Sequence, residues 1–264
     1  MPLRRFTLAF LAVVLPGLLL IACGSADATS PTATEAPIGQ PLAPDLVFAP
    51  LEDLQVGLSP DGRRLLFFTA SIANIGDGPL LIVGSRDEDW ALEQLIAYSE
   101  EGEERIGVPL SMKFGGDGHG HWHVEQAAQY RLMRVDAGPE EAPRFDEKAG
   151  FCFFDQAIYR EEMIGDVTEP RHDTHDCGDE DARTSEMGLS VGWSDPYQWF
   201  LPGQSIDVTD APDGRYRLEA IVDPDQLLSE TNRDNNTTWV EFTMHTRAED
   251  GLAVLELIEA SQPY

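Results

Sequence analysis

Short strand-like segments separated by turn signals run through most of this chain, and they limit its fold more than any other feature. Residues 64–72 are largely apolar, the turn-forming residues 74–78 follow, and residues 79–83 are typical of a second strand. Further strands are predicted at 119–135, 150–155, 205–209, 216–222 and 237–244. Helical periodicity is confined to the short pieces 90–97 and 253–258. The pattern predicts a mainly β fold: a single compact antiparallel β-sandwich-like domain with long loops and few short helices.

The first 44 residues are expected to lie outside that domain. Arg4 and Arg5 precede an apolar stretch that ends just before Cys23, a pattern that resembles a bacterial lipoprotein signal. A membrane-spanning helix is the alternative, but the apolar run is short for a span and contains Pro16. The expected organisation is a signal peptide at 1–22, a lipidated Ser/Ala/Thr/Pro-rich tether at 23–44, the folded domain at 45–245 and a C-terminal extension at 246–264.

Acylation of Cys23 would anchor the exported chain to the outer face of a bacterial membrane, at the cell surface or in the periplasm. The other two of the three cysteines, Cys152 and Cys177, then remain as a pair. In an exported protein such a pair is most simply a disulfide, which would stabilise the fold by roughly 3 kcal/mol. A free reactive thiol is the alternative.

The charge balance is strongly acidic, with 18 basic and 47 acidic residues and a formal net charge of −29. This charge argues against nucleic acid and anionic membrane surfaces as partners, so membrane contact is expected through the lipid anchor only. An acidic surface attracts amines and polycationic proteins, although it also arises simply for solubility.

Three of the six histidines stand at alternate positions: His119, His121 and His123. In an extended strand, such side chains point to the same face. Three neutral imidazoles on one face suit a divalent copper or zinc ion and leave positions open for water or substrate. The alternative is a polar, solvated strand, and the spacing does not choose copper over zinc.

Two other features stand out. Residues 156–191 are acidic, lack an obvious strand pattern and carry His172 and His175, which are interpreted as surface loop residues rather than extra ligands. Lysine is rare, since the chain has sixteen arginines and only Lys113 and Lys148. A lysine retained in such a chain can indicate that a primary amine is needed, although a surface position is the default reading.

Several motifs occur in a fixed order along the chain. They are Pro44-Asp45-Leu46, residues 72–79, His119-Gly-His121-Trp-His123, Lys148-Ala-Gly-Phe-Cys152-Phe-Phe-Asp155, and residues 188–197, 201–210, 213–216 and 222–236. Together they resemble the catalytic domain of the lysyl oxidase family over about residues 44–245. The resemblance implies that 45–245 is a lysyl oxidase-like catalytic domain.

The resemblance assigns His119, His121 and His123 as ligands of Cu²⁺. It implies a self-derived cofactor, lysine tyrosylquinone, made by joining Lys148 to an oxidised Tyr197. The implied activity is oxidation of primary amines, peptidyl lysine among them, to aldehydes by O2, with release of hydrogen peroxide and ammonia.

The sequence leaves the base and the substrate open. Glu125 and Asp155 are candidates for the base that removes the α-proton of the substrate, and the sequence does not choose between them. The chain has no collagen-like context, so the amine could be small, a peptidyl lysine or part of a cell wall. Animal members of the family have additional cysteines, one of them where this chain has Gly118.

The same resemblance implies a structural Ca²⁺ site. Its ligands would come from the start of the domain and from an acidic, Asn-rich loop: Asp45, the carbonyl of Leu46, Glu230, Asn232, Asn235 and Asn236. All-oxygen ligation is what a hard cation prefers. Asn232 stands where the family often has Asp, which removes one negative charge, and a turn capped by Asn side chains is the alternative.

Three rival functions remain open from the sequence. A copper-binding protein without catalysis would use the same histidines and would need no link between Lys148 and Tyr197. A Zn-dependent hydrolase would need a general base beside a metal-bound water. An adhesion module would bind ligands at the loops of the sandwich and would not depend on the histidines.

Overall fold

The computed structural model describes residues 37–115, 119–136, 144–146, 150–247 and 252–264. In this part of the chain nearly all regular structure is β, and all strand pairs are antiparallel. The helical structure described is one 3-10 turn, η1 (Arg86–Glu88). The expectation of a mainly β fold is therefore confirmed.

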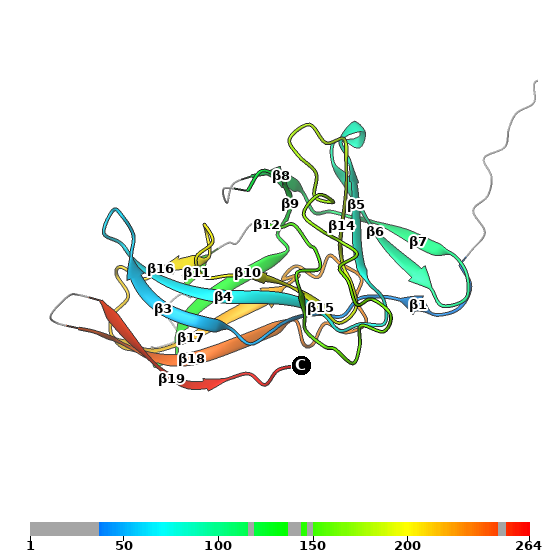
Figure 1. Cartoon of the computed structure of the whole chain (residues 1–264). Helices are drawn as coiled ribbons and strands as arrows, with labels where there is room; N and C mark the ends of the chain where they lie inside the picture. The colour runs from blue at the N-terminus through cyan, green and yellow to red at the C-terminus, as the bar shows by residue number, and fades with distance from the viewer. Residues whose placement is uncertain (1–36, 116–118, 137–143, 147–149, 248–251) are drawn as a thin grey trace, which may run out of the picture. The chain divides into compact units, whose positions relative to one another are not determined.

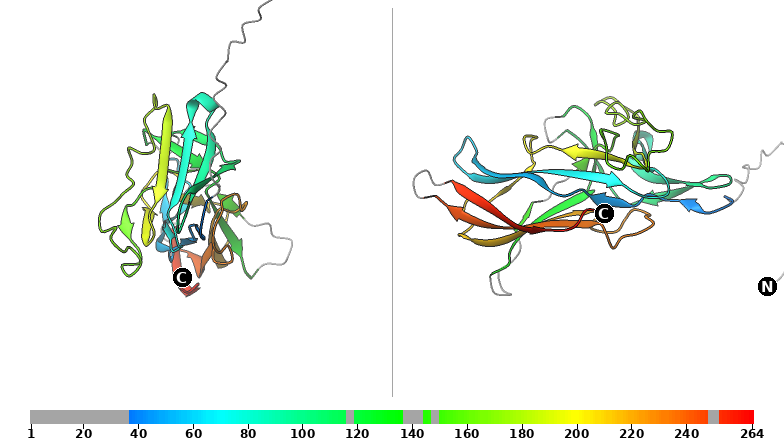
Figure 2. Two further views of the ribbon diagram at one scale, coloured as in Figure 1. Left: turned by 90° about the vertical axis from the view of Figure 1, so that its right-hand side faces the viewer. Right: turned by 60° about the horizontal axis from the view of Figure 1, so that its bottom comes forward.

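Two sheets form a sandwich. Figure 1 and the right view of Figure 2 show the sheet around β4 lying across the sheet that contains β10, β17, β18 and β19. The strands of the first sheet are β2 (Leu46–Phe48), β3 (Glu52–Leu58), β4 (Arg64–Asn74), β13 (Ala157–Ile158), β15 (Trp193–Tyr197) and β16 (Ser205–Asp207). Those of the second are β10 (Ala128–Arg134), β11 (Arg144–Asp146), β17 (Gly214–Val222), β18 (Thr237–Thr246) and β19 (Ala253–Ala260).

Two smaller sheets complete the described fold. One contains β1 (Pro41–Leu42), β5 (Leu80–Ser85), β6 (Ala91–Tyr98), β7 (Glu103–Val108) and β14 (Thr184–Leu189). The other contains β8 (Met112–Phe114), β9 (Trp122–Glu125) and β12 (Gly150–Phe151).

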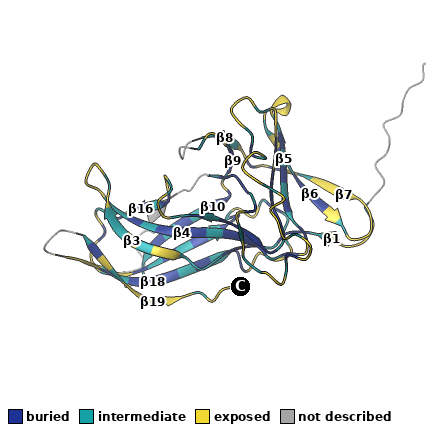
Figure 3. Ribbon diagram, in the orientation of Figure 1, coloured by how far each residue is buried: buried dark blue, intermediate teal, exposed yellow. Residues whose placement is uncertain are grey.

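Alternating side chains build the core between the two large sheets. Leu218, Ala220 and Val222 of β17 are fully buried, while the residues between them are partly exposed. The ring of Tyr130 in β10 packs 4.9 Å from that of Phe68 in β4, edge to face, so the sheets meet through aromatic contacts. Figure 3 shows buried positions along β4 and β18, which face this core.

β4 positions the site because other strands of its sheet pair with it along both of its edges. On one edge it pairs with β2 and β3, and on the other with β15 and β16. Tyr197 lies opposite Ala70 and Ser205 lies opposite Phe67, so residues 198–204 leave the sheet between two strands that share one partner. Tyr197 is therefore held at the point where the chain departs from a buried strand.

Three local predictions are wrong. The piece 90–97, predicted as helical, is strand β6, and 253–258 lies in β19. The apolar spacing of Leu92, Leu95 and Ile96 fits a helix, but β6 pairs with β1, β5 and β7, and this pairing overrides the local preference. The predicted strand 119–135 is divided into β9 and β10 near Gln126, whose φ of +64° ends the first strand.

Residues 156–191 also contain more structure than the sequence indicates, because β13 and β14 lie there and β14 pairs with β5 along its whole length. The signal and tether predicted at 1–22 and 23–44, including Cys23, lie outside the described residues up to position 36. Among the described residues, no helix is long and apolar enough to cross a membrane.

Candidate functional site

The three alternate histidines come together at the start of β9. Each has a ring nitrogen within 4.8 Å of a ring nitrogen of both others. His123 lies in the strand and is buried, whereas His119 and His121 precede the strand on a bend. One extended strand therefore does not carry all three, and the bend brings the first two rings toward the third. Three imidazoles at this spacing fit a copper or zinc ion with open positions.

The β8–β9 connection shapes this bend. Phe114 pairs with Trp122, and the backbone N–H of Gly115 donates to the carbonyl of His121 over 3.0 Å. Gly115 has a φ of +63°, a conformation that glycine adopts without strain. The backbone thus turns at Gly115 and is tied back to the chain at His121.

Trp122 fixes the register of the histidines. Neighbouring residues of a strand point to opposite faces, so its indole points away from His123. Its ring lies 4.5 Å from that of Trp90 and 5.5 Å from that of Phe114, and its N–H donates to the carbonyl of Asp179 over 2.9 Å. A slip by one residue would place a histidine among these aromatic rings and turn the indole toward the face of the histidine cluster.

Tyr197 lines a pocket together with His119 and His121. The pocket has a volume of about 260 Å³. The phenol oxygen of Tyr197 accepts a 3.4 Å hydrogen bond from the backbone N–H of Cys152, and the ring of Phe151 lies 4.3 Å from the tyrosine ring. The structure therefore brings the predicted cofactor tyrosine and two of the predicted metal ligands to one cavity.

Lys148 lies outside the described residues, but the strand that follows it is described. Gly150 pairs with Glu125 in β9, and a Cβ atom at Gly150 would meet the Cβ atom of His123 at 2.6 Å. Only a glycine allows β12 to approach the histidine strand so closely. The segment that carries Lys148 therefore leads into a strand packed directly against the third histidine.

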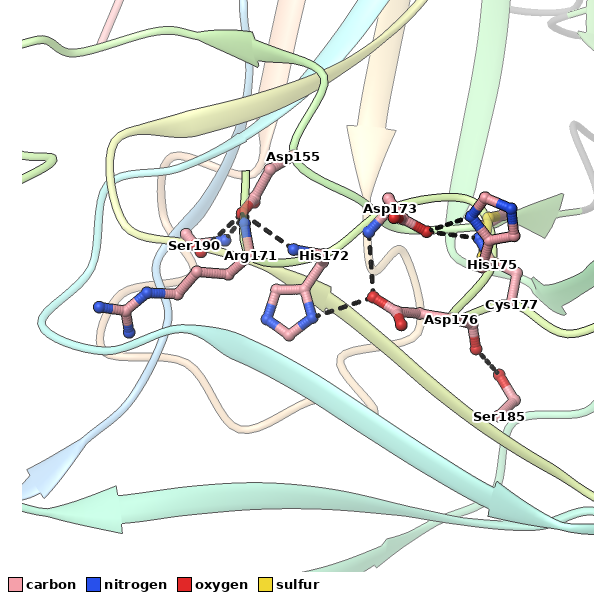
Figure 4. A network of polar contacts seen from close by, with 10 residues as sticks. Asp155, Arg171, His172, Asp173, His175, Asp176, Cys177, Ser185 and Ser190 are labelled. Carbon is pink, nitrogen blue, oxygen red and sulfur yellow. Dashed lines mark hydrogen bonds and ion pairs between the residues drawn. A yellow bond between two sulfur atoms is a disulfide. The ribbon is translucent and has the colours of Figure 1, made fainter. Parts of the chain in front are cut away.

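Neither carboxylate proposed as the base lines this pocket. Glu125 pairs with the exposed Lys113, and its carboxylate lies 3.6 Å from the ammonium nitrogen. Asp155 is buried and holds surrounding loops (Figure 4). Its carboxylate accepts hydrogen bonds from the backbone N–H groups of Arg171 and Ser190 at 2.9 and 2.7 Å, and from the Ser190 hydroxyl at 2.8 Å. Asp155 therefore has a structural role in holding these loops. Its chain neighbours Phe154 and Gln156 do line the pocket.

The loop before β14 forms another wall of the pocket through Thr174. Cys152 and Cys177 form a disulfide that ties this loop to the chain beside Tyr197, so the predicted pair is confirmed. Disulfides are typical of exported proteins, which indicates that the domain folds in an oxidising compartment.

The two histidines of this loop differ in environment. Figure 4 shows His172 facing Asp176, with 3.6 Å between the imidazole nitrogen and the carboxylate. The side chain of His172 is only 15% exposed and packs over Gly188, so it is not the surface residue that was expected. His175 is 92% exposed and follows that expectation.

Five of the six residues expected to hold calcium come together in one polar cluster. The amide nitrogen of Asn235 donates to the Asp45 carboxylate over 2.9 Å, and that of Asn236 donates to Glu230 over 2.9 Å. The backbone N–H of Leu46 donates to the other oxygen of Glu230 over 2.7 Å. Two segments far apart in the sequence thus share one polar cluster.

Two features of this cluster fit a cation. The side-chain oxygens of Asn235 and Asn236 are buried, and no residue that the structure describes donates to them. Burial raises the pKa of Glu230 to about 7, although the hydrogen bonds from Asn236 and Leu46 act in the opposite direction and lower it. A cation here would offset the buried charge, and rotation of the amides would supply oxygen ligands.

Asn232 differs from the other members of the set. It is exposed, and its side-chain oxygen accepts a hydrogen bond from the backbone N–H of Asp234 over 3.1 Å. In this arrangement Asn232 caps its own turn, as the alternative reading of the loop predicts.

The geometry accords with the result of comparison with known families. Residues 114–250, about half of the chain, match the family model described as "Lysyl oxidase". The chain belongs to the lysyl oxidase family. The match contains the histidine cluster, Tyr197 and the Asn-rich loop.

Individual relatives agree with this membership. "Lysyl oxidase homolog 2" of Gallus gallus is 31% identical over 121 residues, which cover 46% of this chain and 14% of the relative. "Lysyl oxidase homolog 3" of Homo sapiens is 29% identical over 174 residues, which cover 66% of this chain and 18% of the relative. The matched region is therefore less than a fifth of these longer relatives.

The sequence reading missed the acidic residue of the pocket, Asp195. It is 1% exposed and lines the same cavity as Tyr197. Asp195 and Tyr197 are two residues apart in β15, a spacing that puts both side chains on one face of a strand. This spacing was visible in the sequence, but residues 193–197 had not been predicted as a strand.

Proposed function

We propose that this domain is a copper-dependent amine oxidase acting outside the cytoplasm, which converts primary amines to aldehydes and releases hydrogen peroxide and ammonia. The observation that carries the proposal is the pocket of about 260 Å³ that Tyr197 shares with His119 and His121. A copper-binding protein without catalysis has no need of a buried tyrosine beside its ligands. A pocket of this size suits a small reacting group, such as the end of an aminoalkyl chain.

The three histidines would hold Cu²⁺, and Lys148 and Tyr197 would form lysine tyrosylquinone. When formed, the quinone supplies an electrophilic carbonyl and an electron sink for amine oxidation, and copper supplies the redox chemistry with O2. The reach of the chain supports the pairing. Lys148 stands two positions before Gly150, which is packed on His123, and each residue spans at most about 3.6 Å.

The protein's own groups hold the tyrosine for this role. The N–H of Cys152 binds its phenol oxygen, and Phe151 restricts its ring. The disulfide to Cys177 anchors the same backbone segment, so the amide donor has a fixed position. Phe154, Pro196 and Leu201 make part of the pocket wall apolar, which limits the water that reaches the reacting groups.

The proposal also includes the class of substrate, a bound calcium ion and attachment to a membrane. The net charge of −29 favours cationic amines, peptidyl lysine among them, over anionic partners. Ca²⁺ would bind at Asp45, Leu46, Glu230 and the Asn residues of the 230–236 loop. The lipid on Cys23 would hold the domain at the outer face of a bacterial membrane.

The test uses the full chain, expressed with copper in an oxidising compartment. Phenylhydrazine, which traps quinones, is expected to give a coloured adduct, and peptide mapping is expected to find Lys148 joined to Tyr197. Lys148→Ala and Tyr197→Phe should each abolish the adduct. Lys113→Arg and Tyr159→Phe, which change the other lysine and an unrelated tyrosine, should retain it.

The rival functions give different results. Bound copper without an adduct or a crosslinked peptide would contradict the oxidase and favour a copper-binding protein. Tight zinc binding with hydrolytic activity that survives Lys148→Ala would favour the hydrolase.

A further inference from the structure

The described pocket contains one acidic side chain, Asp195. Its other lining groups are imidazoles, a phenol, amides, a hydroxyl and apolar side chains. Asp195 is buried, with 1% of its surface exposed, and it belongs to the same strand face as Tyr197. A carboxylate is therefore built into the wall of the cavity, two residues from the proposed cofactor tyrosine.

The backbone around Asp195 is well supported. In β15, Asp195 lies opposite Ile72 and Tyr197 lies opposite Ala70, both in the central strand β4. On the other edge of β15, Ser194 lies opposite Ala157 of β13. A strand paired on both sides holds its side chains more firmly than a surface loop does.

The other carboxylates considered as the base do not line the pocket. Asp155 accepts hydrogen bonds from Arg171 and Ser190 and does not line the pocket, and Glu125 is paired with Lys113. His119 and His121 do line it, but an imidazole nitrogen that binds a metal cannot also accept a proton.

We propose that Asp195 is the catalytic base of the amine oxidation. This inference rests on the proposed function. The proton on the carbon that bears the substrate nitrogen passes to an Asp195 oxygen as the C–H bond breaks. The electron pair of that bond passes to the quinone, which is the oxidant, and the carbon reaches the oxidation level of an aldehyde. Water supplies the aldehyde oxygen, the substrate nitrogen leaves as ammonia, and O2 later accepts two electrons and two protons to give hydrogen peroxide.

The test compares Asp195→Asn with the wild type in the copper-loaded full chain. The variant is expected to bind copper and give the phenylhydrazine adduct at wild-type stoichiometry, because Asn keeps the size of the side chain. Its kcat for a primary amine is expected to fall by about 10² to 10⁴-fold, the usual range for loss of a general base. With an α,α-dideuterated amine, the isotope effect on kcat should rise as proton removal becomes rate-limiting. Asp181→Asn, at an exposed position, is the matched control and should leave all three measurements unchanged.

Two results would overturn the assignment while leaving the oxidase intact. One is an Asp195→Asn variant whose kcat stays within threefold of the wild type. The other is a variant that binds copper but forms no adduct, since the carboxylate would then be needed before turnover. If the wild-type protein gave no adduct, that result would instead contradict the proposed function itself.

A second variant covers the case in which Asp195→Asn does not fold. Asp195→Glu keeps the carboxylate but displaces it by one methylene, so kcat should fall while the isotope effect rises. A lower kcat with an unchanged isotope effect would contradict the proposal.

Discussion

At the scale of single residues, Asp155 shows how a buried charge organises the walls of the pocket. Its carboxylate joins three parts of the chain: its own segment, the loop at Arg171 and the start of the segment at Ser190. Phe154 and Gln156, on either side of it, line the pocket, so a change at Asp155 is transmitted directly to that wall.

Replacement of Asp155 by Ala is therefore expected to lower the free energy of unfolding by about 3 kcal/mol, because buried N–H groups lose a charged acceptor. Chemical denaturation followed by fluorescence would measure this loss. Asp181→Ala, at an exposed position, should change stability by less than about 0.5 kcal/mol. Equal stability of the two variants would show that the Asp155 contacts do not hold the loops.

The residue scale also shows what could be predicted from sequence. His119, His121 and His123 could be grouped because their spacing is local, and their rings do lie together. Asp155 and Asp195 could not be distinguished, since their roles depend on which distant backbone groups approach each carboxylate. Burial and hydrogen bonding are properties of the folded chain, and no motif in the sequence records them.

At the scale of elements, a cross-strand cluster between β17 and β18 makes stability depend on pH. Glu241 is buried and accepts hydrogen bonds from Arg217, directly opposite, and from Arg215, over 2.9 and 2.8 Å. Burial favours the neutral carboxyl, but the hydrogen bonds and charges of Arg217 and Arg215 outweigh it and hold the Glu241 pKa below its ordinary value of 4.5.

Because this pKa is lowered on folding, the contribution of Glu241 is present above about pH 4.5 and is lost as the pH falls through the lower, folded-state value. The free energy of unfolding of Glu241→Gln should therefore depend less steeply on pH than that of the wild type in this acid range. Denaturation curves collected between neutral and acidic pH would measure the difference. Parallel pH profiles for the two proteins would contradict this account.

A second prediction at this scale concerns the close approach of β12 to β9. In Gly150→Ala, the new methyl group would overlap the Cβ atom of His123, so the two strands must separate. We expect a loss of about 2 kcal/mol in unfolding free energy and weaker copper binding in a metal titration. Gly107→Ala in β7, where a Cβ atom meets nothing within 4 Å, is the control and should be neutral or nearly so. Equal copper affinity in both variants would show that the packing of β12 against β9 does not affect metal binding.

Element prediction from sequence succeeded where apolar runs were long and bounded by turns, as in β4 and β18. It failed for β6 and β19, where helix-like apolar spacing was outweighed by pairing with neighbouring strands. Such pairing joins residues that are distant in sequence, so local periodicity cannot report it.

At the scale of the whole described domain, the polar cluster around Glu230 joins the beginning of the domain to its end. Asp45 and Asn235 are 190 positions apart, and Leu46 and Glu230 are 184 apart. The side chain of Gln94 in β6 forms two hydrogen bonds with the backbone of Ser229, so a third segment holds the same loop. A cation bound only by the folded cluster would connect these segments and would stabilise the whole domain rather than one strand.

Removal of Ca²⁺ with a chelator is accordingly expected to lower the Tm of the wild-type chain, and added Ca²⁺ should raise it in a concentration-dependent way. Binding to the folded state alone adds about 2.7 kcal/mol when the free ion is at 100 times its Kd. Glu230→Gln and Asn235→Ala should remove this dependence, because they delete a charge and an oxygen ligand. Asp234→Asn, an exposed change in the same loop, should preserve it. A Tm that responds equally to Ca²⁺ in all four proteins would mean that the ion binds elsewhere, and the buried amide oxygens of the cluster would then have no role in binding it.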